Sequence, residues 1–204
     1  METPYSLDRD LGEARAMAEG LESYVRGGQL YGTVNDGGMF STVDDMPSLT
    51  IGALLLRLRR LQALERQMTP EQKAILTEIE AGHDAVRSDW QEHYRGMLHN
   101  EAGARLRSLE AYLAECDGSP DTCAGDYLPE ALRRTMLQEI ADALHRYHLP
   151  EIDLPKTLRD RDVQLRRFTE PSDFIWDAAL RVAYPQDKFW WLYERPQVTE
   201  REER

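Results

Sequence analysis

The chain has 204 residues, of which 41% are hydrophobic and 30% are charged, and its formal net charge is −12. This length predicts one domain that can bury its own core, and the composition argues against an intrinsically disordered chain. Counted in successive fifty-residue blocks, no part of the sequence is basic overall. Nucleic acid and anionic membrane surfaces are therefore not expected as partners, because both attract positively charged faces.

The first predicted helix begins after Ser6, a capping residue, and ends at about Arg26, where Gly27 and Gly28 stop it. Its apolar residues recur every three or four positions, as one helix face requires: Leu7, Leu11, Ala14, Met17, Leu21 and Tyr24. Residues 29–43 then contain two β-prone runs around Asn-Asp-Gly-Gly. A small β-hairpin or a long irregular loop is expected there.

A second helix is predicted after Pro47, with Ser48 as its cap. It contains the most apolar segment of the chain, from Ile51 to Leu61. A helix that is apolar over so wide a face belongs at the centre of a bundle.

A third and longer helix begins with the clearest local signal in the sequence. Thr69 can cap it, Pro70 suits the first helical position, and Gln72 completes a capping box. Helical periodicity continues to Leu113 without an interrupting proline. The sequence leaves open whether this is one helix or two, and residues 100–103 are where we expect a kink or break.

Cys116 and Cys123 bracket the loop that follows. The N-terminus lacks the basic and apolar regions of a secretory signal, so we expect a cytoplasmic protein. In a reducing cytosol these residues should stay two ordinary thiols, with a disulfide and a metal site as the alternatives.

The remaining sequence predicts further helices at about 128–148, at about 158–168 and from Thr169 to about Val182. The whole chain is thus predicted to be all-α. We expect a single-domain bundle of about five or six helices with a long central helix over residues 1–196. A charged, flexible tail is expected at residues 197–204.

Histidines and carboxylates supply the only candidate chemistry. Glu80 and His83 form a Glu-x-x-His pair, a spacing that places a carboxylate and an imidazole on one metal in di-iron bundles. The sequence holds no second such pair, so a surface glutamate beside a partly buried histidine is favoured. A mononuclear metal site would have to bring His83 or His93 together with His145 and His148.

Nucleophile-elbow, Walker A and dinucleotide-binding motifs are missing from the sequence, and no cofactor is expected. The aromatic run at 189–193 has two interpretations. It either plugs the core or leaves Trp190 or Trp191 exposed as a contact for a protein partner.

Three function classes remain. The preferred hypothesis is a non-enzymatic interaction or scaffold protein that self-associates, because the long helix and the tryptophan pair suit partner binding. A helical small-molecule binder with an apolar pocket near the second helix is one alternative. A metal-dependent helical enzyme using the histidines is the other.

Overall fold

The computed structural model describes residues 4–33, 47–118, 120–149 and 153–197. The fold is all-α, as predicted, with helices α1 (Leu7–Gly27), α2 (Ile51–Leu64), α3 (Pro70–Asp89), α4 (Gln91–Gly118), α5 (Pro120–Gly125), α6 (Tyr127–Arg146) and α7 (Leu154–Leu165). Short 3-10 helices cover Glu65–Gln67, Ala178–Ala183 and Trp190–Tyr193. Strands β1 (Thr169–Pro171) and β2 (Glu194–Pro196) form a small antiparallel sheet, in which Thr169 lies opposite Pro196.

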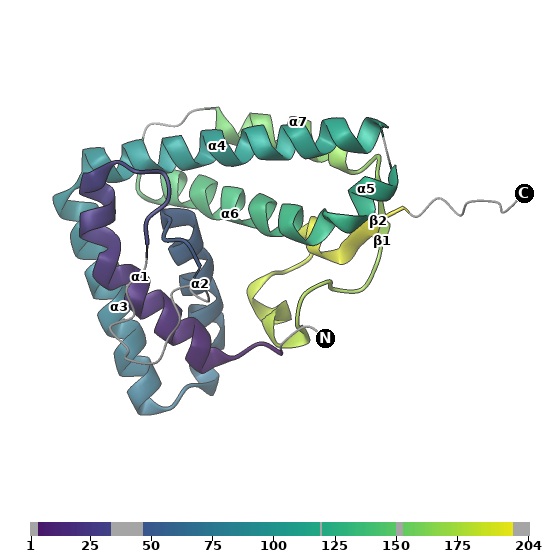
Figure 1. The fold of residues 1–204 in the computed structure, drawn as a ribbon. Coiled ribbons are helices and arrows are strands. Elements are labelled where there is room, and N and C mark those ends of the chain that lie inside the picture. Colours follow the sequence, from purple (N-terminus) through teal and green to yellow (C-terminus); the bar gives the residue numbers. More distant parts are fainter. Residues whose placement is uncertain (1–3, 34–46, 119, 150–152, 198–204) are drawn as a thin grey trace, which may run out of the picture.

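The helices form two groups that cross (Figure 1). α1, α2 and α3 run alongside one another, and α4, α6 and α7 extend across one end of them. α1 packs on both α2 and α3, while α2 packs on α6 and α6 on α4. The segment after α7 passes beside α2 through Ala178–Ala183 and ends in the sheet next to α5.

Local capping signals predicted several helix ends correctly. The Ser6 side chain accepts a hydrogen bond from the amide of Arg9 at the start of α1. Gly28 ends that helix with a φ of 68°, a left-handed conformation that glycine adopts without strain. The capping box of Thr69 and Gln72 is also confirmed at the start of α3.

The cap of α2 is Thr50, not Ser48 as predicted. The Thr50 hydroxyl accepts from the amide of Ala53, 3.1 Å away. Leu49 forms an isolated β-bridge with Gly32, so the chain stays extended up to Thr50. The prediction that this helix is central is confirmed, because ten of its residues are buried.

The long helical segment is two helices, and the break expected at 100–103 was wrong. It falls at Trp90, whose φ of −120° and ψ of 37° separate α3 from α4. Residues 100–103 stay helical within α4, which has 28 residues. Their helical geometry is held by long-range packing, since Glu101 and Ala102 are buried in the core.

The helix predicted from Thr169 to Val182 was also wrong. Thr169–Pro171 pairs with β2, and the amide of Ile175 donates to the carbonyl of Leu192 at 2.9 Å. The Phe174 and Tyr193 rings lie 5.1 Å apart between centroids. These contacts with the chain end override a weak helical pattern, and only Ala178–Ala183 forms a 3-10 helix.

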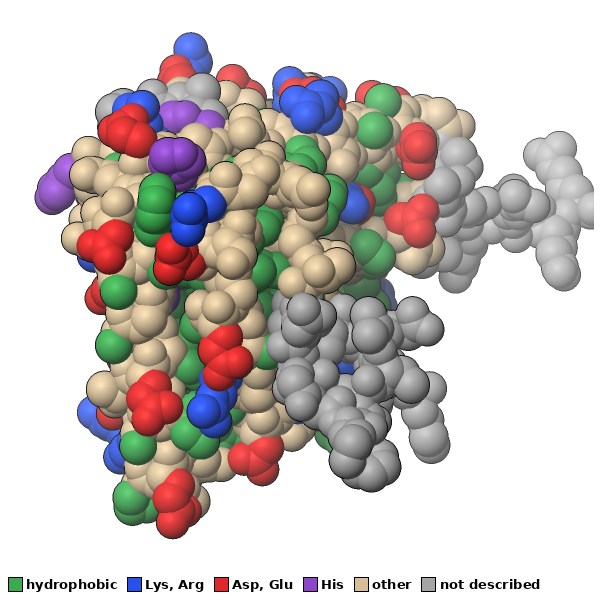
Figure 2. All heavy atoms as spheres, turned by 60° about the vertical axis from the view of Figure 1, so that its left-hand side comes forward, with side chains coloured by type: hydrophobic (Ala, Val, Ile, Leu, Met, Phe, Trp, Pro, Cys, Tyr) green, Lys and Arg blue, Asp and Glu red, His purple; other side chains and the backbone are tan. Residues whose placement is uncertain are grey.

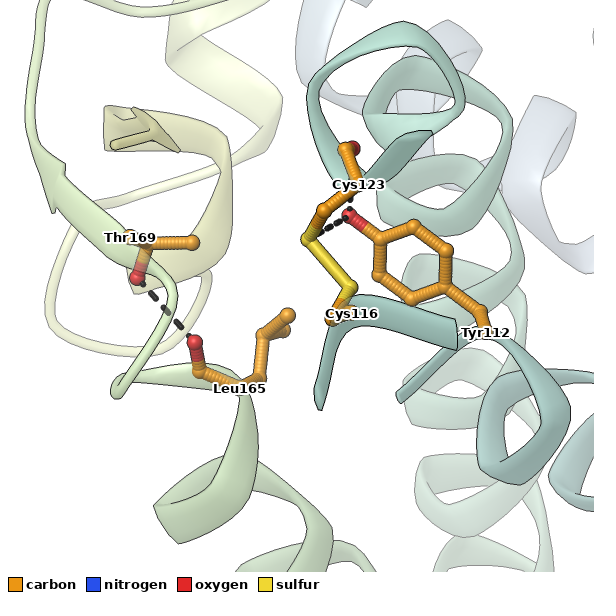
Figure 3. The surroundings of a disulfide bond; sticks show 5 residues. All are labelled: Tyr112, Cys116, Cys123, Leu165 and Thr169. Carbon is orange, nitrogen blue, oxygen red and sulfur yellow. Dashed lines mark hydrogen bonds between the residues drawn. A yellow bond between two sulfur atoms is a disulfide. The ribbon is translucent and has the colours of Figure 1, made fainter. Parts of the chain in front are cut away.

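Cys116 and Cys123 form a disulfide that joins the end of α4 to α5 (Figure 3), so the expectation of two free thiols is corrected. Their Cα atoms are 4.9 Å apart. The Tyr112 hydroxyl donates to the carbonyl of Cys123 at 2.9 Å and fixes α5 against α4.

The predicted hairpin at 29–43 falls largely on residues 34–46, outside the described residues, and so does the predicted tail from residue 198 onward. No helix in the part of the chain that the structure describes is long and apolar enough to cross a membrane. Figure 2 turns forward the side that lies at the left of Figure 1, and acidic and basic side chains are interspersed over that face.

Candidate functional site

A hollow of about 380 Å³ lies between α2, α3 and the end of α6, and we call it the α2–α3 pocket. Its volume falls within the range of roughly 300–1,000 Å³ that small-molecule sites occupy. It is lined by Leu55, Leu58, Arg59 and Gln62 of α2, by Glu80, His83, Asp84 and Arg87 of α3, and by Glu139, Ala143, Arg146 and Tyr147 at the end of α6.

The pocket is built from one stripe of each helix. The α2 and α3 residues both follow the spacing i, i+3, i+4, i+7, which places four side chains on one helix face. The α6 residues follow i, i+4, i+7 and then reach Tyr147, the residue after the helix. Because α1 packs on both α2 and α3, these stripes are free to face the hollow between the two helices.

His83 is the most deeply buried polar group of the pocket, with 2% of its surface exposed. Its Nε2 atom lies 2.8 Å from the Tyr94 hydroxyl, and its Nδ1 atom lies 3.4 Å from a carboxylate oxygen of Asp84. Burial lowers the pKa of His83 to about 4, although Asp84 opposes the shift. The imidazole is therefore neutral at physiological pH.

The polar neighbours of His83 favour one tautomer. The Asp84 carboxylate can only accept, so Nδ1 carries the hydrogen, and Nε2 accepts from the Tyr94 hydroxyl. Burial also raises the pKa of Tyr94, which keeps this hydroxyl protonated. Tyr147 completes an aromatic group with His83, since the two ring centroids are 6.3 Å apart.

The α2 side of the pocket holds carboxylates that already have partners. Glu139, 4% exposed, is hydrogen-bonded to the guanidinium of Arg59, which also donates to Asp142 at 2.8 Å. Burial raises the pKa of Glu139, and Arg59 opposes that shift. Glu80 accepts from the side-chain amide of Gln62 at 2.7 Å.

Two further guanidiniums lie near the pocket's aromatic group. The Arg87 guanidinium carbon is 4.3 Å from the Tyr147 ring centroid, within cation–π range. The Arg146 guanidinium carbon is 6.0 Å from the same ring. Arg87 also donates from Nε to Asp84 at a long 3.4 Å.

Of the residues proposed for a metal site, only Glu80 and His83 come together, both in the pocket. His93 is exposed on α4, with its ring 5.6 Å from that of Trp90. His145 is exposed on α6, and His148 follows that helix with a positive φ of 52°. Over the described ranges, no three His, Cys, Asp or Glu side chains are placed to hold a metal ion.

The two tryptophans proposed for partner binding have different environments. Trp191 is a core residue with 1% exposure, and its indole nitrogen donates to the Thr135 hydroxyl at 2.9 Å. Trp190 is half-buried, and the Arg166 guanidinium carbon lies 3.7 Å from its ring centroid. Only Trp190 therefore keeps exposed surface that a partner could contact.

Sequence reasoning found Glu80 and His83 but missed Arg59, Arg87 and Arg146. These arginines belong to rows of polar residues at helical spacing, and such rows also occur on any solvent-exposed helix face. The sequence pattern therefore does not distinguish them from ordinary surface residues. Chemically, the pocket offers the guanidiniums of Arg87 and Arg146 beside the Asp84 carboxylate at its α3–α6 side. Next to α2, the carboxylates of Glu80 and Glu139 are paired with Gln62 and Arg59. No protein-family model, no curated protein and no solved structure matches this chain.

Proposed function

We propose that this protein binds a small polar molecule in the α2–α3 pocket and acts as a helical binding or regulatory protein. The observation that supports this most directly is the convergence of three helical stripes, far apart in sequence, on one hollow of ligand size. This is the small-molecule alternative among the sequence-based hypotheses, although that hypothesis expected an apolar pocket near the second helix. The pocket is more polar than expected, because only Leu55, Leu58 and Ala143 are aliphatic.

The buried polar groups of the pocket give a second argument. Burying a charged or polar side chain costs free energy unless its hydrogen bonds are replaced. His83 and Glu139 are both buried here, and each is held by a specific partner, Tyr94 or Arg59. Perturbed titratable groups that line one cavity are typical of functional sites.

Ligand binding would also stabilise the relative positions of three helices. A ligand that binds only the folded state at a hundred times its Kd adds about 2.7 kcal/mol to the free energy of unfolding. The lining residues belong to α2, α3 and the end of α6. Occupancy is therefore expected to restrict the motion of α3 relative to α2 and α6.

Gln62→Trp is expected to block the pocket, because Gln62 is an exposed lining residue of α2 and a larger ring there fits without disturbing the core. A thermal-shift screen of a metabolite library should find ligands that raise the Tm of the native protein and not of this variant. Amide chemical shifts should locate the hits at Leu58, His83 and Ala143.

Gln186→Trp is the matched control, since Gln186 is also exposed and lies outside the pocket lining. It should bind every hit as the native protein does. Hits that bind the Gln62→Trp variant with native affinity would place the ligand site elsewhere and contradict the proposal.

Self-association remains a second proposal, supported by the half-exposed indole of Trp190 beside the guanidinium of Arg166. Tryptophan and arginine are enriched among residues that dominate interface energies. Sedimentation velocity should show a concentration-dependent dimer that Trp190→Ala weakens about tenfold or more. Trp176→Ala, at another half-buried tryptophan, should leave the dimer intact. A native protein that stays monomeric at high concentration would rule this proposal out.

A cytoplasmic location also remains a proposal from the sequence. The disulfide is compatible with it only if reductants reach the sulfur atoms slowly, because thiol–disulfide exchange needs access to a sulfur. Cys116 and Cys123 are both buried, which supports such protection.

A further inference from the structure

We infer that the ligand of the α2–α3 pocket carries a carboxylate or phosphate group, and that Arg87 and Arg146 bind this group. The inference rests on the proposed function, since it names the ligand class of the same pocket. Both arginines line the pocket, and their guanidinium carbons lie 4.3 Å (Arg87) and 6.0 Å (Arg146) from the ring centroid of Tyr147.

Unused hydrogen-bond donors are the first argument. A guanidinium has five N–H donors in a planar fork that matches a carboxylate or a phosphate. Within the described residues, Arg87 donates only from Nε to Asp84, and Arg146 forms no ion pair. Arg59 differs, because its guanidinium is already shared between Glu139 and Asp142.

Preorganisation of the Arg87 guanidinium is the second argument. Stacking on the Tyr147 ring restricts the Arg87 side chain, so less of its conformational entropy is lost when an anion binds. Arg87 and Arg146 also lie in the last turns of α3 and α6. The free carbonyl groups at these helix ends attract a cation, but each end carries only about half a negative charge. Each guanidinium therefore keeps positive charge that an anion can neutralise.

His83 adds a third donor to this side of the pocket. Its neutral imidazole points Nδ1–H toward Asp84, an exposed carboxylate at the pocket rim. An anion bound by the arginines can accept from the same N–H when Asp84 turns into solvent. Donors from α3 and α6 thus line the same side of the pocket.

The α2 side of the pocket does not compete for these donors. Glu80 is hydrogen-bonded to Gln62, and Glu139 is hydrogen-bonded to Arg59. These contacts hold both carboxylates toward α2. An anionic group therefore has its most favourable place between Arg87 and Arg146, and the rest of the ligand extends toward Leu55 and Leu58.

The test uses inorganic phosphate and succinate as probes, followed through the amide resonances of the isotope-labelled full chain. Either probe should shift Leu58, His83 and Ala143, while succinamide, the neutral analogue of succinate, should not. Arg87→Gln and Arg146→Gln should each weaken probe binding about tenfold or more, the usual effect of losing a charge-assisted hydrogen bond. Tighter binding of phosphate or of succinate would indicate which anionic group the ligand carries.

Arg66→Gln is the charge-matched control, because Arg66 is exposed and lies outside the pocket lining. It should bind both probes with native affinity. Probe binding that is absent, or that both pocket variants retain unchanged, would overturn the inference. A library ligand without an acidic group that is blocked by Gln62→Trp would overturn it while leaving the proposed function intact.

Discussion

Gly52→Ala is expected to lower the free energy of unfolding by about 2 kcal/mol, the usual cost of overpacking a buried site. A Cβ atom at this position would lie 2.5 Å from a carboxylate oxygen of Glu101 and 3.3 Å from Cδ1 of Ile140. Glu101 cannot move away easily, because it is 1% exposed and accepts hydrogen bonds from Gly52 N and Arg105. The direction of this stability change is informative, since alanine normally stabilises a helix by about 1 kcal/mol relative to glycine.

Urea unfolding of the purified variant measures this effect, and Gly82→Ala is the matched control. A Cβ atom at Gly82 of α3 would meet nothing within 4 Å, so that variant should be as stable as the native protein or more so. The cost of Gly52→Ala should largely disappear in a Glu101→Ala background, because the clash then has no partner. A stable Gly52→Ala protein would show that Glu101 does not hold the start of α2.

This contact explains why the sequence misplaced the break in the long helix. Glycine and asparagine at 100–103 weaken a helix locally, and the prediction rested on that alone. The structure keeps these residues helical because the Glu101 carboxylate accepts a hydrogen bond from Gly52 N at 2.9 Å. A bond between positions so far apart in the sequence has no local signature. Helix caps were easier to predict, because Ser6 and Thr69 bond within three residues of themselves.

The same distinction holds for the candidate site. The Glu80–His83 spacing located two lining residues, since both lie on one face of α3. This face meets residues of α2 and α6 only because of the way the three helices pack. The spacing of residues along one helix cannot predict that packing. His145 and His148 looked equally suitable in the sequence, yet they lie on exposed positions at the end of α6. Convergence in space, and not residue type, separates the two sets.

Protonation of His83 alone is expected to lower the free energy of unfolding by roughly 3 kcal/mol. This loss occurs as the pH drops from the pKa of His83 in the unfolded chain to its pKa in the folded protein. The folded pKa is about 4 and the ordinary value is 6.5, because burial disfavours the imidazolium. Between these values the unfolded chain binds a proton that the folded chain does not. The contribution is therefore fully present above the ordinary pKa and is lost progressively as the pH falls below it.

Comparing His83→Gln with native protein by urea unfolding between about pH 7.5 and pH 4.5 isolates this contribution. The difference in unfolding free energy between the two proteins should shrink as the pH falls, because the variant lacks the titrating group. Glu139 and Asp10, whose pKa values burial raises, act in the opposite direction, but they are the same in both proteins and cancel in the difference. His93→Gln, at an exposed histidine, should keep the native pH dependence. A constant difference across this range would mean that His83 is accessible to protons in the folded state, and the neutral imidazole could then no longer serve as a fixed donor in the pocket.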